Sequence, residues 1–110
     1  MTNRYRAEQA LEIGGRRLVL RLSLRALAEL ETIFEVEGIE ALGARLAKGG
    51  IRTSHVVRIV GALARGSGDT VSDGELAVLI DAAELPRMVE AVTSVFAAGL
   101  GGKAAPANPL

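Results

Sequence analysis

The chain contains no cysteine, which excludes disulfide bonds, thiolate zinc sites and cysteine nucleophiles. Aromatic residues are scarce, because Tyr5, Phe34 and Phe96 are the only three and tryptophan is absent. The core must therefore be aliphatic, which favours closely packed helices over a β-sandwich. The longest apolar stretches, residues 76–80 and 95–100, fall far short of the ~20 residues that span a bilayer, so we expect no membrane partner.

What the chain does contain is enough apolar material for one core, since 49% of its 110 residues are hydrophobic. This length leaves room for one domain. The first six residues are polar, and no apolar signal core follows them. We therefore expect a soluble, cytoplasmic protein. One domain is expected over residues 1–100, followed by a flexible C-terminal tail over residues 101–110.

The 13 basic and 13 acidic residues cancel overall, but they occur in alternating blocks along the chain. Residues 1–25 carry six arginines against two glutamates, and residues 26–40 carry five glutamates and no base. Residues 41–66 carry five bases and no acid, whereas residues 69–90 carry six acids and one arginine. This alternation predicts that neighbouring elements neutralise one another within the fold. The alternative is a basic face that meets a partner.

The clearest local signal is Gly14-Gly15, which can supply the positive φ angles of a two-residue hairpin turn. If these glycines form the turn, the numbers of facing residues sum to 29. This register gathers apolar side chains on one face, namely Leu11, Ile13, Leu18, Leu20 and Leu22. The other face then has two opposite-charge pairs, Glu12 with Arg17 and Glu8 with Arg21. An isolated hairpin is only marginally stable, so we expect its apolar face to pack on helices.

Helical periodicity and end signals predict four to five short helices after the hairpin. Ser23 is a good N-cap for the first helix, and Gly38 would terminate it. A second helix is expected over about residues 40–48, with Leu42 and Leu46 on one side. A third begins at Thr53 or Ser54 and ends near residues 65–66.

Two further helices are expected in the last third of the chain. Ser72 and Glu75 have the spacing of a capping box, which would start a short fourth helix. The apolar stripe of that helix would be Leu76, Leu79, Ile80 and Ala83. Pro86 suits the first turn of a last helix. Four apolar residues align along this last helix, namely Val89, Val92, Phe96 and Leu100.

The third helix is apolar around more than half of its circumference, with one stripe made of Val56, Ile59, Val60 and Leu63. Val57, Gly61 and Ala64 form a second stripe, which Arg58 and Arg65 flank. A helix that is apolar on two sides is either central to its own bundle or covered by a partner. If the chain has a partner-binding surface, we expect it at the second stripe and its flanking arginines, namely Val57, Arg58, Gly61, Ala64 and Arg65.

No residue pattern meets the requirements of catalysis or metal binding. His55, the only histidine, has neither a neighbouring nucleophile nor further ligands, so we expect a packing or surface role. Asp69 and Asp73 resemble part of a calcium loop, but Ile80 stands where its bidentate glutamate belongs. Residues 99–103 lack the setting of a phosphate loop. Glutamates of the first helix look like a solvated face, namely Glu29, Glu31 and Glu35. We therefore expect no enzyme, no cofactor and no small-molecule substrate.

Nucleic-acid binding is the alternative that the basic block of residues 41–66 raises. Zero net charge argues against it, as does the absence of stacking aromatics in that block. No helix-turn-helix spacing is evident either. A small nucleic-acid-binding regulator is therefore disfavoured.

Several runs of the chain carry a resemblance to a known family: residues 4–31, 41–43, 59–68 and 71–76. Over residues 4–100 the chain resembles the gene-transfer-agent type of phage tail assembly chaperones. These are small proteins encoded in the tail-gene clusters of prophages and gene transfer agents. The resemblance rests on structural residues rather than on a catalytic signature.

This resemblance implies a non-enzymatic protein that keeps the tape-measure protein, or tail-tube subunits, soluble until the tail tube polymerises. Some descriptions of the family instead imply a structural component of the tail tube. A long helical tape measure needs its apolar stripes covered, and a helix in a groove is one common way to do so. The residues and the resemblance together predict an α+β domain, an N-terminal antiparallel hairpin packed on helices, that acts by binding other proteins. A homo-oligomer is one open possibility.

Overall fold

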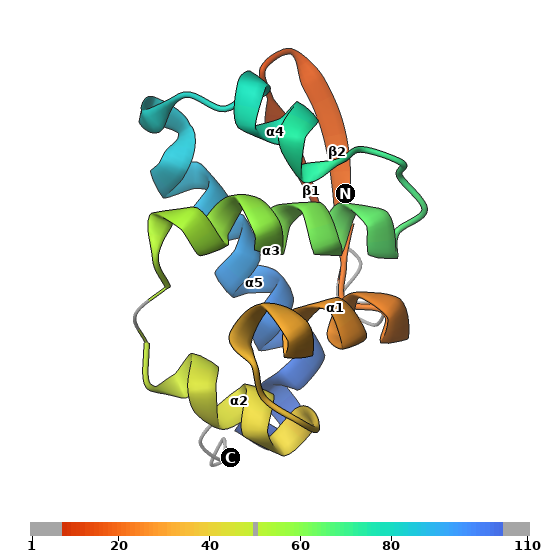
Figure 1. The fold of residues 1–110 in the computed structure, drawn as a ribbon, viewed down its shortest axis with the longest axis vertical. Coiled ribbons are helices and arrows are strands. Elements are labelled where there is room, and N and C mark those ends of the chain that lie inside the picture. The colour runs from red at the N-terminus through yellow and green to blue at the C-terminus, as the bar shows by residue number, and fades with distance from the viewer. Residues whose placement is uncertain (1–7, 50, 105–110) are drawn as a thin grey trace.

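The computed structural model describes residues 8–49 and 51–104, with the side chains of residues 100–104 excepted. Within these ranges an N-terminal hairpin is followed by five α-helices, so the predicted α+β class is confirmed. The elements occur in the order β1 (Glu8–Ile13), β2 (Arg16–Arg21), α1 (Leu24–Phe34), α2 (Ile39–Ala47), α3 (Thr53–Gly66), α4 (Asp73–Leu79), a 3₁₀ turn (Ala82–Glu84) and α5 (Leu85–Ala104). In Figure 1, α3 crosses the middle of the molecule, with the hairpin turn and α4 at one end and α2 at the other.

The hairpin has the predicted register. β1 and β2 pair antiparallel from Glu8 opposite Arg21 to Ile13 opposite Arg16, so the facing numbers sum to 29. Gly14 and Gly15 have φ angles of 56° and 77°, the left-handed values that a two-residue turn of this kind requires. The apolar face of the hairpin is buried in its central part, at Leu11, Ile13, Leu18 and Leu20. Residue 7, which would form the next pair of this register, lies outside the described residues.

Helix α3 is the centre of the core. Its predicted inner stripe is buried throughout, at Val56, Ile59, Val60 and Leu63. Helix α1 and strand β2 pack against α3, and α4 and α5 also contact it. The second apolar side of this helix therefore lies against its own domain, which is the first of the two outcomes that a doubly apolar helix allows.

Helix α1 begins as predicted but ends earlier. The Ser23 hydroxyl accepts the backbone N–H of Ala26 at 3.1 Å, which is the expected N-cap contact. The helix ends at Phe34 because Glu35 adopts the left-handed conformation, with φ 57°. The predicted stop at Gly38 was therefore wrong. Gly38, with φ 92°, instead precedes α2, whose first residue is Ile39.

The last third of the chain departs from the prediction in its helix lengths. The capping box of Ser72 and Glu75 is confirmed in both directions, with distances of 3.1 and 2.8 Å. Helix α4 ends at Leu79, however, and Ala83 lies exposed in the 3₁₀ turn, so it does not extend the α4 stripe. A capping box at Asp81 and Glu84 starts this separate turn.

Helix α5 has Pro86 in its first turn, as predicted, but it faces the core with more residues than expected. Val92 and Phe96 are buried, and so are Met88, Ala91 and Val95. Val89, which aligns with Val92 and Phe96 in the sequence pattern, is 39% exposed. The helix continues to Ala104, so it includes the first four residues of the expected tail, 101–104. Residues 105–110 lie outside the described part.

Candidate interaction surfaces

The five residues predicted to bind a partner do not share one exposed face. Gly61 and Ala64 are buried, Val57 is half-buried, and only Arg58 is fully exposed. Arg65 is half-buried and bound to carboxylates of the same chain. None of these observations tests whether a partner binds there, so the surface stays a prediction. A partner could reach the buried members only if the elements that cover them moved.

Gly61 shows what covers this side of α3. A Cβ atom built on Gly61 would collide with the Oδ1 atom of Asp73, and it would lie 2.9 Å from the Nη1 atom of Arg65. The start of α4 therefore lies directly over Gly61, and an ion pair occupies the space that a side chain would need. The small residue in the second stripe of α3 makes room for a contact within the domain.

Arg65 is the centre of that contact. Its Nη2 atom lies 2.7 Å from Glu29 of α1, and its Nη1 atom lies 3.0 Å from Asp73 of α4. Nη1 also donates to the carbonyl oxygen of Val71 at 3.0 Å. Hydrogen bonds from Arg65 hold the pKa of Glu29 below its usual value, although burial opposes this shift. The prediction that Glu29 belongs to a solvated face was therefore wrong.

A second ion pair joins the hairpin to the loop before α4. The Nη2 atom of Arg16 lies 2.8 Å from the Oδ1 atom of Asp69. The same Asp69 oxygen accepts the backbone N–H of Val71 at 2.9 Å. The two aspartates that resembled a calcium loop thus have structural partners within the chain. In the described ranges, no group of three or more histidine, aspartate or glutamate side chains is placed to hold a metal ion.

These ion pairs confirm part of the charge prediction. Arg65 belongs to one basic block and contacts the acidic blocks on both sides of it, while Arg16 of the first basic block contacts Asp69. Acidic and basic blocks therefore neutralise one another where α1, α3, α4 and the hairpin meet.

The other half of α3 has a different environment. His55 lies edge-on to the ring of Phe34, with 5.2 Å between the ring centroids and an interplanar angle of 73°. The guanidinium carbon of Arg45 lies 5.0 Å from the centroid of the same ring, a cation–π contact. Burial lowers the pKa of His55, and the nearby charges of Arg52, Arg45 and Arg58 lower it further. The Nδ1 atom of His55 is buried without a hydrogen-bond partner.

The comparison with known families decides which class of protein this is. A family model described as "Phage tail tube protein, GTA-gp10" matches residues 6–102. The chain belongs to this family. No curated protein matches the chain. No solved structure matches it either.

Membership of the phage tail tube family confirms the gene-transfer-agent and phage-tail part of the sequence prediction. It does not specify an assembly chaperone. None of the helices in the described residues is long and apolar enough to cross a membrane.

The described residues expose few large hydrophobic side chains. The described residues include four exposed large hydrophobic side chains: Leu24 at 83%, Val78 at 86%, Ile39 at 41% and Val89 at 39%. These four residues belong to four different helices, and no single helix carries two of them.

A groove lies between β1 and α5, and no pattern in the sequence predicted it. Its rim carries Glu12 of β1 and, from α5, Arg87 and Glu90. Ser94 of α5 and Gln9 of β1 also line it. The packing of the hairpin on α5 brings these residues together, although the β1 and α5 residues are separated by 75 or more positions in the chain.

Proposed function

We propose that the chain is a non-enzymatic tail assembly factor, which binds a tail protein reversibly in the cytoplasm of the bacterial host. Membership of the phage tail tube family is the observation that supports a role in the tail. The tail-tube protein and the tape-measure protein are the candidate partners. The proposal needs no small-molecule substrate and no cofactor.

The small number of large hydrophobic side chains that the described residues expose favours a reversible contact. Permanent interfaces usually bury a large area with an apolar centre, similar to a protein core cut in half. The broad apolar side of α3, which the sequence offered as a groove for a tape-measure helix, is covered by the domain itself. A partner would instead meet charged side chains and scattered apolar ones, as transient complexes commonly do.

A structural component of the tail tube is the second candidate function, and the description of the family favours it. The two functions differ in whether the protein remains in the finished particle. A tube component stays in the finished particle in many copies, whereas an assembly factor leaves before the particle is complete.

Quantitative mass spectrometry of purified tails or gene-transfer-agent particles tests the choice. An assembly factor should be absent from the particles but present in lysates of cells that are assembling tails. Recovery of the chain in a fixed ratio to the tail-tube protein would establish the second function instead. Co-purification with each partner expressed separately would then show which tail protein it contacts, and failure with both would contradict the reversible-binding proposal.

A further inference from the structure

Six exposed charged side chains lie around the N-terminal half of α3 and form two clusters of opposite sign. Three exposed glutamates lie in the α1–α2 turn and at the start of α2, and we call them the acidic cluster: Glu35, Glu37 and Glu40. Three exposed bases lie at the end of α2 and on α3, and we call them the basic cluster: Lys48, Arg52 and Arg58. No ion pair involves any of these six residues in the part of the chain that the structure describes.

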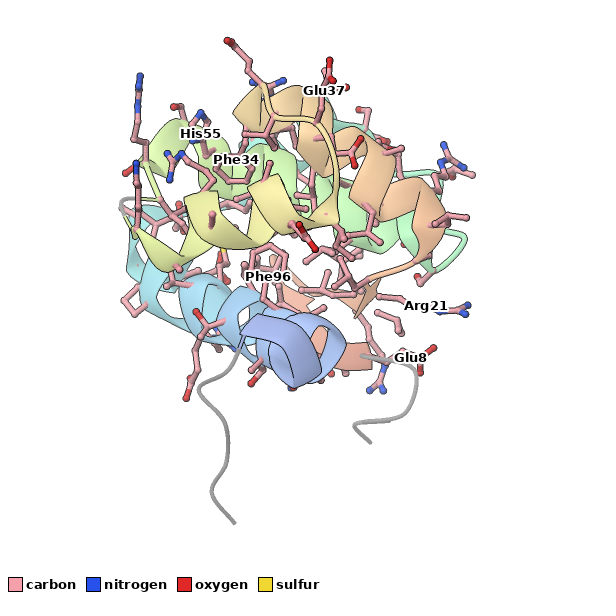
Figure 2. All side chains as sticks on the ribbon, turned by 90° about the horizontal axis from the view of Figure 1, so that it is seen from below. Glu8, Arg21, Phe34, Glu37, His55 and Phe96 are labelled. Carbon is pink, nitrogen blue, oxygen red and sulfur yellow. The ribbon has the colours of Figure 1, made fainter. Side chains whose placement is uncertain are left out.

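The two clusters lie next to each other. Phe34 precedes the acidic cluster in the chain, and its ring contacts His55, which sits among the arginines of the basic cluster. Figure 2 shows Phe34, His55 and Glu37 on one side of the molecule, away from Phe96 and from the hairpin residues Glu8 and Arg21. The Phe34–His55 contact therefore marks the boundary between the clusters.

The first turn of α3 adds to the positive side. Its N-cap residue, Arg52, makes no side-chain capping hydrogen bond, and the first turn contains no acidic residue. The described first turn of α3 therefore supplies no side chain that neutralises the partial positive charge at its N-terminus. Carboxylates are the groups that this end of α3 would attract.

We propose that the two clusters form one self-complementary interface with a second copy of this chain. In this dimer the acidic cluster of each copy lies on the basic cluster of the other, around a two-fold axis that passes near Phe34 and His55. A two-fold interface uses the same patch on both subunits, so the patch must complement itself. Adjacent clusters with three charges of each sign meet this condition.

A nucleic acid fits this surface less well, because the acidic cluster would repel phosphates that approach the neighbouring bases. The proposal does not depend on either tail function, since an assembly factor and a tube component could both dimerise.

Salt dependence is the first test. Sedimentation equilibrium of the full chain should show a dimer at about 50 mM NaCl, and its dissociation constant should rise about ten-fold at about 500 mM NaCl, because salt screens exposed charges. A protein that stays monomeric at low salt up to about 500 µM overturns the proposal, as does a dimer that salt does not affect. A monomer that binds duplex DNA at low salt also overturns it and assigns the basic cluster to nucleic acid.

Charge reversal gives the sharper test. The variant R52E/R58E should lose the dimer, because two acidic surfaces then face each other, and E35K/E37K should lose it for the opposite reason. An equimolar mixture of the two variants should form a heterodimer, since each reversed cluster then meets an opposite charge. The matched control R17E/R87E changes the net charge as much as R52E/R58E does, but at exposed residues of β2 and α5, and it should still dimerise.

The mixture distinguishes this interface from other effects of charge. Circular dichroism should show that all the variants fold, because the substituted side chains are exposed. A mixture that stays monomeric overturns the proposal, and so does a control that loses the dimer as completely as R52E/R58E.

Discussion

Arg65 and Arg58 lie two turns apart on α3, but their surroundings differ. Arg65 is half-buried and bound to Glu29 and Asp73, while Arg58 is exposed and has no ion pair in the described residues. The C-terminal half of the helix therefore uses its charge to hold α1 and α4 together. The N-terminal half leaves the charges of Arg52 and Arg58 exposed on the surface. Arginine thus connects elements of the domain at one end of this helix, whereas at the other end it is exposed to solvent.

The largest effect is expected where the C-terminal half of α3 meets the hairpin. A Cβ atom on Gly66 would lie 2.8 Å from the carbonyl oxygen of Arg21 and 2.9 Å from Cβ of Ala26. We expect Gly66→Ala to lower the free energy of unfolding by about 3 kcal/mol, because backbone atoms of β2 cannot easily move away. Urea denaturation measures this value.

Gly43 of α2 provides the matched control for Gly66. A Cβ atom there would meet nothing within 4 Å, and its backbone is helical. Gly43→Ala should therefore raise the free energy of unfolding by about 0.5–1 kcal/mol, the usual gain of alanine over glycine in a helix. Equal effects of the two substitutions would show that the close approach at Gly66 is not a constraint.

The comparison of the two arginines predicts the next effect. Arg65→Met would remove the ion-pair partner of Asp73 and the nearer partner of Glu29, at a cost of about 2 kcal/mol. Glu29 would keep only the longer contact with Arg25, at 3.6 Å. This cost is below that of a fully buried pair, because the Glu29 and Asp73 side chains are 30% and 42% exposed. Arg58→Met should change the unfolding free energy by less than about 0.5 kcal/mol. Similar losses for both variants, measured by denaturation, would remove the distinction between the two halves of the helix.

The sequence predicted the elements whose determinants are local. Gly14 and Gly15 specify the turn by their φ angles, and alternation along the strands then determines the register of every described pair. The capping box at Ser72 depends on residues three positions apart, so it too was predictable. The end of α1 was not, because Glu35 adopts a left-handed conformation that is usually found at glycine or asparagine.

The candidate site was harder to predict because its residues meet only through tertiary packing. Block alternation suggested that acids and bases would pair, but it could not indicate that Arg65 binds Glu29 and that Arg58 binds neither neighbour. The spacing of Gly61 and Ala64 on α3 is the same whether α4 or a partner covers them. Sequence periodicity describes which faces are apolar, whereas the structure shows what lies against each face.

The smallest effect concerns pH and tests the N-terminal half of α3. Burial and the charges of Arg52, Arg45 and Arg58 lower the pKa of His55 in the folded protein. The unfolded chain therefore takes up this proton at a higher pH than the folded one does. The stability that neutral His55 contributes is complete above its ordinary pKa of about 6.5, and it is lost as the pH falls below that value.

Urea denaturation between about pH 7.5 and pH 5 should consequently show a decline in stability that His55→Gln removes. The pKa of Glu29 is lowered as well, but for an acid the stability is lost only below its ordinary value of about 4.5, outside this range. The Arg65→Met background separates the two halves of the helix, since it removes the main cause of the lowered pKa of Glu29 and should leave the His55 decline intact. A decline that persists in His55→Gln would mean that the loss arises from groups outside the basic end of α3.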